Sequence, residues 1–425
     1  MDITILGAGI SGMSAAYHAN KMKIGYQVYE RKKRYGGLLR SIEKKGYTFD
    51  RCTHLSFTKD DYVKSLFSET ELFTYNSKPN SIKDNIWYPY PITDHLNRLS
   101  LYNKIKIIFN YIFRKRFKSA TNYYEWLLDQ YGSMITNDYF LQYTIKYWRR
   151  EPKDLDVDWV AKRLPSFNIY KLFKSIIGIQ KKSSYYINEL RYPKKGGFIS
   201  FLNFSLKNKV NYNYEVKGIS LKNKTITFKN GERKDYEKVV SSIPLPEYIN
   251  YIDDLPQHII FKLKKLYWTS VALVSIGYKI YDNLHENDAI WFYIYDKKYE
   301  ASRAYFTHKK SQHNSPRGFG GIQFEIYFDW NSKDQINKLA LSDNCIKFCK
   351  ENNIIGDDHE VLSYNVVKYG NIIMDNERET HVKDIRDYLE SCDIHTIGRF
   401  GEWDYLWSDG SLLSGKRKIE EIIQV

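Results

Sequence analysis

The sequence predicts an α/β fold in three parts: a parallel-sheet domain, an inserted helical domain and an antiparallel β-sheet domain. Three observations predict it. A strand–helix–strand pattern opens the chain over residues 2–30, a helix-rich region covers residues 90–185, and short alternating segments fill residues 260–330. At 425 residues the chain exceeds the size at which one hydrophobic core stops growing, so several structural units are expected.

The first domain is expected to be discontinuous and to consist of residues 1–80, 190–250 and 385–425. The middle segment reads as a β-meander that ends in the buried strand pattern "KVVSSI", and the last segment as a strand, a Gly-rich turn and a closing helix. Residues 90–185 are then a helical insertion. Residues 260–330 form an antiparallel sheet whose face could cover a ligand.

A glycine fingerprint lies between the first predicted strand and the first predicted helix. The segment "GAGISG" contains Gly7, Gly9, Ile10, Ser11 and Gly12. In this context the first glycine permits a tight turn, the second lets the backbone approach a pyrophosphate, and the third lets helix and strand pack closely. The helix N-terminus then faces the phosphates. This pattern predicts a Rossmann-like dinucleotide site.

Glu30 ends the second predicted strand, where an acid can accept hydrogen bonds from a ribose 2′-OH. A carboxylate there disfavours NADP and leaves FAD or NAD. The segment "ERKKRYGGLLRS" then adds Arg31, Gly36, Gly37, Leu38 and Arg40. A second glycine turn with a guanidinium is a second anion cradle, more than a simple NAD site requires, so FAD is the predicted cofactor.

This segment resembles the extended motif of the glutathione-reductase-like FAD proteins, especially their amine oxidase and sugar-mutase branches. Val216 in "NYEVKGI" is similar to the β-meander residue that holds adenine there, and "VVSSIPL" to the return of the chain. "GRFGEWDYLWSDGSLLSG" resembles the C-terminal segment that wraps the flavin. The resemblance implies cofactor-binding roles for Gly398, Arg399, Asp409, Gly410 and Ser411. His54 in "FDRCTHLSF" corresponds to a position beside the flavin.

Three further segments narrow the resemblance to the UDP-galactopyranose mutases: "WYPYPITDHL", "YTIKYWRREPKDLDVDWVAKRLP" and "ASRAYFTHKKSQHNSP". The resemblance implies that Arg163 and Arg303 clamp the diphosphate of a nucleotide sugar, as guanidinium forks do. It also implies substrate contacts from aromatic residues, which are Tyr90, Trp148, Trp159, Tyr327 and Tyr405. The chain departs from the family pattern where Asp94 and His95 replace an amide pair, and where Phe167 replaces an arginine of some members.

The resemblance implies an isomerase that interconverts pyranose and furanose forms of a UDP-galactose-like sugar for surface polysaccharide biosynthesis. Reduced-flavin N5 attacks the anomeric carbon, the diphosphate leaves and the sugar recloses, with no net redox change. An external reductant such as NAD(P)H is left open. The alternatives are an FAD-dependent oxidoreductase of the amine oxidase or desaturase type, with an apolar or amine-sized pocket, and a flavin-holding scaffold for a glycan assembly complex.

Net charge, cysteine spacing and apolar run length indicate which classes of partner the protein can have. A formal net charge of +15 attracts anions, but no specific nucleic-acid partner is predicted. The basic "FRKRFK" after the apolar "IIFNYIF" reads either as a membrane-surface helix or as a solvated helix end. The four cysteines lack CxxC spacing, so no metal site is predicted. No apolar run is long enough to span a bilayer, and a cytoplasmic protein of open oligomeric state is expected.

Overall fold

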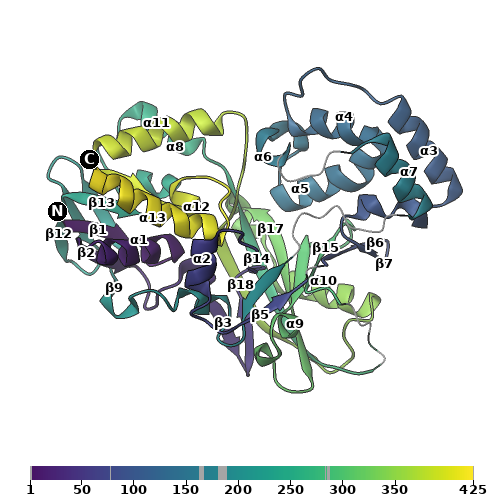
Figure 1. Ribbon diagram of the computed structural model, residues 1–425, viewed down its shortest axis with the longest axis horizontal. Helices are drawn as coiled ribbons and strands as arrows, with labels where there is room; N and C mark the ends of the chain where they lie inside the picture. The colour runs from purple at the N-terminus through teal and green to yellow at the C-terminus, as the bar shows by residue number, and fades with distance from the viewer. Residues whose placement is uncertain are drawn as a thin grey trace.

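The computed structural model describes residues 2–76, 78–161, 167–179, 189–282, 284 and 288–424. The α/β domain with both termini lies at one side of Figure 1, the helical insertion at the other, and a large antiparallel sheet below and between them. The predicted fold class is confirmed in each of its three parts. Within the described ranges, no helix combines the length and apolar character needed to cross a bilayer.

A five-stranded parallel sheet forms the centre of the α/β domain, in the order β19-β13-β1-β2-β9. Its central strand, residues 2–6, is buried on both faces, with Ile3 and Ile5 on one face and Thr4 and Leu6 on the other. Strands from three separate parts of the chain meet here: β1 (Asp2–Leu6), β2 (Gly25–Glu30), β9 (Val210–Tyr212), β13 (Lys238–Ser241) and β19 (Ile394–Thr396). The first helix, α1 (Ile10–Lys21), packs against the last, α13 (Ser408–Gln424).

The antiparallel region is a seven-stranded sheet in the order β18-β14-β17-β16-β15-β6-β7. It extends beyond residues 260–330, because strands from both sides of the chain join its edges. One of these, β6, pairs in parallel with β15 through Ser81 and Tyr293. The strands are β6 (Asn80–Lys83), β7 (Ile86–Pro89), β14 (Trp268–Lys279), β15 (Trp291–Ile294), β16 (Arg303–Phe306), β17 (Phe319–Asp329) and β18 (His359–Ile372). Phe348 of α10 (Lys338–Glu351) packs into the core of this sheet.

Three smaller sheets connect these parts. The expected β-meander is the three-stranded sheet of β10 (Val216–Ser220), β11 (Thr225–Phe228) and β12 (Arg233–Asp235). The two-stranded sheets are β3 (Ser41–Lys44) with β4 (Tyr47–Asp50), and β5 (Leu72–Tyr75) with β8 (Leu190–Pro193). The remaining helices outside the insertion are α2 (Asp61–Phe67), α8 (Gln257–Lys264), α9 (Thr307–Lys310), α11 (Arg378–Ser391) and α12 (Gly398–Gly401).

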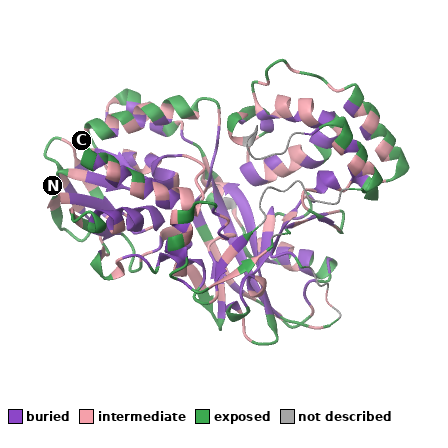
Figure 2. Cartoon of the chain, viewed as in Figure 1, coloured by how far each residue is buried: buried purple, intermediate pink, exposed green. Residues whose placement is uncertain are grey.

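The helical insertion contains α3 (Leu101–Ile112), α4 (Tyr123–Ile135), α5 (Gln142–Trp148), α6 (Asp158–Ala161) and α7 (Ile169–Ile177). Its three main helices begin at side-chain caps, which satisfy backbone N–H groups that have no partner within the helix. The caps are Ser100, Asn122 and Asn168. The core of the insertion is rich in tyrosine and leucine, and Figure 2 shows green, solvent-exposed faces along its outer helices.

Candidate functional site

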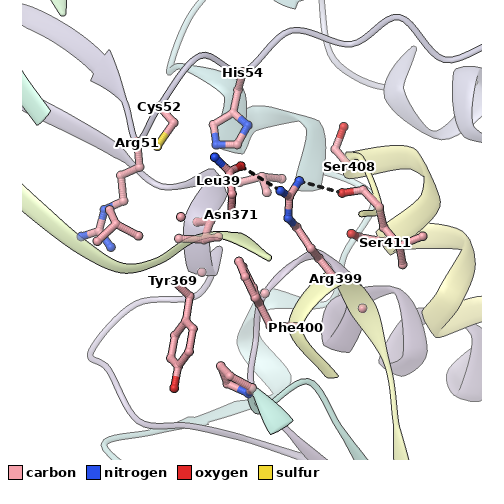
Figure 3. Close-up of a pocket in the computed structure, with 18 of the residues that line it drawn as sticks. Leu39, Arg51, Cys52, His54, Tyr369, Asn371, Arg399, Phe400, Ser408 and Ser411 are labelled. Atoms are coloured by element: carbon pink, nitrogen blue, oxygen red, sulfur yellow. Dashed lines mark hydrogen bonds between the residues drawn. The ribbon is translucent and has the colours of Figure 1, made fainter. Parts of the chain in front are cut away.

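A cavity of about 870 Å³ is lined by residues of the parallel sheet, the antiparallel sheet and the helical insertion. Figure 3 shows part of its wall. A volume of this size lies within the usual range of small-molecule and cofactor pockets. Most of the residues singled out from the sequence line it, although they come from segments that are hundreds of positions apart.

The glycine fingerprint forms one end of the cavity. Gly7 has a φ of +96°, and a Cβ there would lie 2.3 Å from Ser242 Oγ. A Cβ on Gly12 would lie 1.9 Å from the Gly7 carbonyl oxygen, so the turn and the helix can approach only without side chains. Gly7, Gly9, Ile10 and Ser11 line the cavity, whereas Gly12 shapes the turn behind it.

Glu30 lies at the end of β2, beside this turn. Its Oε2 accepts a hydrogen bond from the Ala8 backbone N–H at 2.8 Å, and its Oε1 accepts one from the Lys32 N–H at 2.9 Å. A carboxylate has about four lone-pair sites, so further acceptor capacity remains for ribose hydroxyls. Arg31 lines the cavity next to it.

The second glycine pair packs onto the first. The Gly36 N–H donates to the Ala8 carbonyl oxygen at 2.7 Å, and a Cβ on Gly37 would lie 3.1 Å from Gly9 Cα. Gly37, Leu38 and Arg40 line the cavity, and Gly36 lies behind it. Burial lowers the pKa of Arg40, but a guanidinium stays charged at neutral pH. The two glycine turns together form a continuous anion cradle.

The C-terminal segment closes the cavity from the other side. A Cβ on Gly398 would lie 2.2 Å from Ser11 Oγ, which fixes α12 against the start of α1. Arg399 donates to the Leu406 carbonyl oxygen at 3.2 Å and to Asn371 Oδ1 at 3.1 Å (Figure 3). Ser411 lines the cavity, whereas Asp409 and Gly410 lie behind it. Val216 lines its meander end.

Several polar atoms in the cavity wall have no hydrogen-bond partner within the described part of the chain, and three of them are His54 Nε2, Asn371 Nδ2 and Arg399 Nε. Figure 3 shows the His54 ring directed toward Asn371 and Arg399. Buried polar groups without partners cost stability, so such a group of atoms indicates a bound polar ligand. Burial lowers the pKa of His54 to about 4, and its ring is therefore neutral at physiological pH.

Arg303 forms a buried ion pair with Glu325. Its Nε and Nη2 donate to Glu325 Oε2 at 2.9 and 2.6 Å, and Tyr327 donates its O–H to the same oxygen at 2.7 Å. Burial alone would lower the pKa of Arg303, but the Glu325 carboxylate raises it well above its usual value. Burial would raise the pKa of Glu325, but Arg303 lowers it. Among the described residues these bonds leave Arg303 Nη1 available to a ligand.

An aromatic wall faces this ion pair. The Trp148 and Trp159 rings pack edge to face with centroids 4.7 Å apart, and both lie against the Tyr405 ring, at 5.7 and 6.0 Å. The Arg399 guanidinium lies 4.2 Å from the centroid of Tyr405. Tyr90 also lines the cavity, with its ring 4.7 Å from that of Tyr293.

Sequence reasoning missed several tyrosines that line the cavity, among them Tyr143, Tyr147, Tyr293 and Tyr295. A local signal existed for each pair. The first two are one helical turn apart on α5, and the last two alternate on one face of the segment that contains β15. In a chain with 38 tyrosines this signal does not distinguish a cavity wall from ordinary core. Arg51 and Asn371 were missed as well, because nothing near them in sequence marks them.

Some residues from the sequence analysis lie elsewhere. Arg163 falls outside the described residues. The described lining does not include Asp94, His95 or Phe167. Asp94 is buried, and the Phe167 ring packs against Tyr131 with centroids 4.9 Å apart. The departures at these three positions therefore change the packing of the helical insertion rather than the cavity wall.

Comparisons with known proteins agree with this geometry. A family model for an NAD(P)-binding Rossmann-like domain matches residues 5–70. The crystal structure of reduced UDP-galactopyranose mutase matches with a TM-score of 0.92 at 22% identity, covering 100% of this chain and 95% of that one. The chain has the fold of UDP-galactopyranose mutase. The resemblance inferred from sequence is thereby confirmed at the level of the fold.

Oxidases share the fold more distantly. A structure assigned as a protoporphyrinogen oxidase from Exiguobacterium sp. 255-15 has a TM-score of 0.76 at 14% identity, covering 99% of this chain and 98% of that one. A redesigned putrescine oxidase has a TM-score of 0.66 at 14% identity, covering 100% and 99%. No curated protein sequence matches the chain. The fold alone thus leaves the chemistry to be argued from the site.

Proposed function

We propose that the protein is an FAD-dependent mutase that interconverts the pyranose and furanose forms of a UDP-galactose-like nucleotide sugar, for surface polysaccharide biosynthesis. The whole-chain match to UDP-galactopyranose mutase is the observation that carries the proposal. The cavity supports it, because the glycine cradle opens directly onto Arg303 and a wall of phenol and indole side chains. In this proposal residues 1–80, 190–250 and 385–425 bind FAD, residues 90–185 cover the cavity, and residues 260–330 carry Arg303.

The cavity residues fit FAD. The two glycine turns suit its pyrophosphate, Glu30 its ribose, and Val216 its adenine. The unpartnered atoms of His54, Asn371 and Arg399 suit the polar edge of its ring. The reduced flavin would supply a nucleophilic nitrogen for the anomeric carbon, and an external donor such as NAD(P)H would keep it reduced.

The protein's own side chains would position the nucleotide sugar and exclude water. Arg303 presents Nη1 to the diphosphate, and Glu325 holds the guanidinium in one orientation through two hydrogen bonds. Tyr327 steadies this pair, since its O–H is donated to Glu325. A fixed cation stabilises a leaving diphosphate without reorganising during the reaction. Trp148 and Tyr405 offer flat apolar surfaces to the base or the sugar.

The test is to incubate dithionite-reduced protein with UDP-, GDP- and dTDP-sugars and to search for a product of unchanged mass and altered ring size. Arg303→Lys keeps a positive charge for Glu325 but loses the guanidinium fork. We therefore expect kcat/KM to fall about tenfold or more. Arg317→Lys is the matched control, because Arg317 is exposed and lies outside the cavity lining. Absence of any ring isomer, with the flavin shown to be reduced, contradicts the proposal.

The second candidate is an FAD-dependent oxidoreductase of the amine oxidase or desaturase type, because oxidases share the fold over nearly the whole chain. An oxidase would need an apolar or amine-sized pocket near the flavin. Here the cavity instead presents a cationic side chain, Arg303. Anaerobic bleaching of the oxidised flavin by an amine or hydrocarbon substrate, without turnover of any nucleotide sugar, would favour this second function.

A further inference from the structure

The outer helix of the insertion exposes its apolar face. Five side chains of α3 and the Phe113 side chain at its C-cap are exposed on one side of the helix, at intervals of three or four residues. The five are Leu101, Tyr102, Ile105, Phe109 and Ile112. Phe109 is 59% exposed and Phe113 is 79% exposed, with their rings stacked 6.4 Å apart. Ile107 and Tyr111 are buried on the opposite side. An amphipathic helix usually has one apolar side, which is buried. Here α3 has a second apolar side, and that side faces solvent.

The neighbouring helix α7 also exposes apolar side chains to solvent. Ile169, Tyr170, Phe173 and Ile177 are exposed at the same helical spacing, and the exposed Ile179 follows the helix. The two helices contact each other, and Figure 1 places them together at the outer end of the insertion, far from both termini. We call these exposed apolar residues of α3 and α7, with Ile179, the outer face. Large apolar side chains exposed in this number on two contacting helices indicate an interaction site.

The outer face lies in a strongly basic stretch of chain. No acidic residue occurs between Asp94 and Glu125 or between Asp158 and Glu189. Lys106 Nζ lies 4.1 Å from the Tyr102 ring centroid, and Lys174 Nζ lies 4.2 Å from that of Tyr170. An acidic partner comes from α4, where Asp129 Oδ1 lies 3.6 Å from Arg116 Nε. Other basic residues follow α3 directly, namely Arg114, Lys115 and Lys118.

This charge pattern selects the kind of partner. A second copy of the chain would form a symmetric contact in which the same patch meets itself, so its net positive charge would face the same positive charge. A short acidic peptide would need a groove, but the large cavity includes no residue of α3 or α7 in its lining, and both helices lie at the outer edge of the molecule. Exposed phenylalanine and isoleucine side chains flanked by lysines match an anionic lipid surface.

We propose that the outer face docks the protein on the surface of an anionic phospholipid bilayer. Phe109, Phe113 and Phe173 enter the boundary between headgroups and acyl chains, while Lys106 and Lys174 pair with lipid phosphates. The contact is peripheral, since it uses the side of two helices and no spanning segment. The inference is independent of the proposed mutase activity, because the outer face contributes nothing to the described lining of the cavity.

The test is sedimentation of the full-length, flavin-loaded protein with vesicles of phosphatidylcholine and phosphatidylglycerol, or of phosphatidylcholine alone. We expect binding to the mixed vesicles only, weakened by high salt. The double variant Phe109→Glu/Phe113→Glu should bind about tenfold or more weakly, because it removes two large apolar groups and adds two negative charges. Leu339→Glu/Phe261→Glu is the matched control, since both residues are exposed apolar side chains on other helices.

Flavin content and circular dichroism show whether each variant is folded. Salt-sensitive binding by the wild type and the control, lost in the folded Phe109→Glu/Phe113→Glu protein, supports the proposal. Equal vesicle binding by that variant overturns it, as does absence of binding by the wild type. A dimer in solution that the same variant dissociates, without vesicle binding, overturns it in favour of a second copy.

Discussion

Replacing Arg303 with methionine should destabilise the protein through the partner that it leaves behind. Glu325 has a fully buried side chain, and Arg303 supplies its countercharge through bonds of 2.6 and 2.9 Å. Methionine fills much of the same volume but carries no charge. Removing one partner of a buried ion pair costs about 3–5 kcal/mol, because the remaining charge is uncompensated.

The structure places the expected cost near the lower end of that range. The Arg303 side chain is 18% exposed toward the cavity, and Glu325 keeps the Tyr327 O–H and the Thr53 N–H as donors. We therefore expect Arg303→Met to lower the free energy of unfolding by about 3 kcal/mol at pH 8. The double variant Arg303→Met/Glu325→Gln removes both charges and keeps an acceptor for those donors. Its loss should be about 1 kcal/mol.

The pH dependence has a defined sign. In the wild type Arg303 lowers the pKa of Glu325, so the pair stabilises the fold above the usual carboxyl range and this contribution is lost on acidification. In Arg303→Met the lowering by Arg303 is gone, and burial, which raises that pKa, is opposed only by the weaker hydrogen bonds from Tyr327 and Thr53. The pKa of Glu325 is then higher than in the wild type, so the carboxyl protonates more readily on acidification and becomes neutral. The penalty of Arg303→Met relative to the wild type should therefore shrink between pH 8 and pH 5.

The assay is urea unfolding of the wild type, both single variants and the double variant, followed by tryptophan fluorescence and circular dichroism, which should give coincident transitions. The double-mutant cycle isolates the coupling between the two side chains. Additive losses, or a loss below about 1 kcal/mol for Arg303→Met at pH 8, would refute the claim that a buried charge is held by its partner.

Two further predictions concern the cofactor end of the cavity. Gly12→Ala places a Cβ 1.9 Å from the Gly7 carbonyl oxygen, so the purified protein should lose most of its bound flavin by absorbance, whereas Gly410→Ala, whose Cβ meets Leu406 at an ordinary 3.5 Å, should retain it. Burial lowers the pKa of His54 to about 4, so only the unfolded chain takes up a proton there as the pH falls from 6.5 toward 4. Stability should fall by about 2 kcal/mol between pH 8 and pH 5 from this histidine. The variant His54→Gln should not lose this stability between pH 8 and pH 5. If its stability has the same pH profile as the wild type, the His54 ring of the wild type titrates normally.

Much of the glycine-turn end of the cavity could be predicted because its signals are local. Gly7, Gly36 and Gly37 adopt positive φ values that other residues rarely reach, and the turn needs them whatever packs around it. The position of Glu30 could be predicted because it ends the second strand, directly after one strand and one helix. The parallel sheet is equally local in origin, since buried strands give continuous apolar runs that a short window of sequence reveals.

The Arg303 end of the cavity depended on contacts between distant segments. Arg303 meets Glu325 because β16 and β17 pair in one register, and register depends on the connection and on both strands together rather than on either strand alone. The pairing of β6 with β15 brings together residues from opposite sides of the helical insertion. The buried contact of Lys310 with Asp50, at 2.9 Å, joins segments with no shared local pattern.

By itself, the sequence determined the glycine turns, the parallel strands and the periodicity of each helix, since all three follow from backbone sterics and local repeats of apolar residues. Only the tertiary structure decided which face of α3 meets solvent, because its apolar residues surround more of the helix than one neighbour can cover. It also decided which of the many tyrosines reach the cavity. Burial is a property of the assembled chain, because each contact between two segments buries surface on both of them.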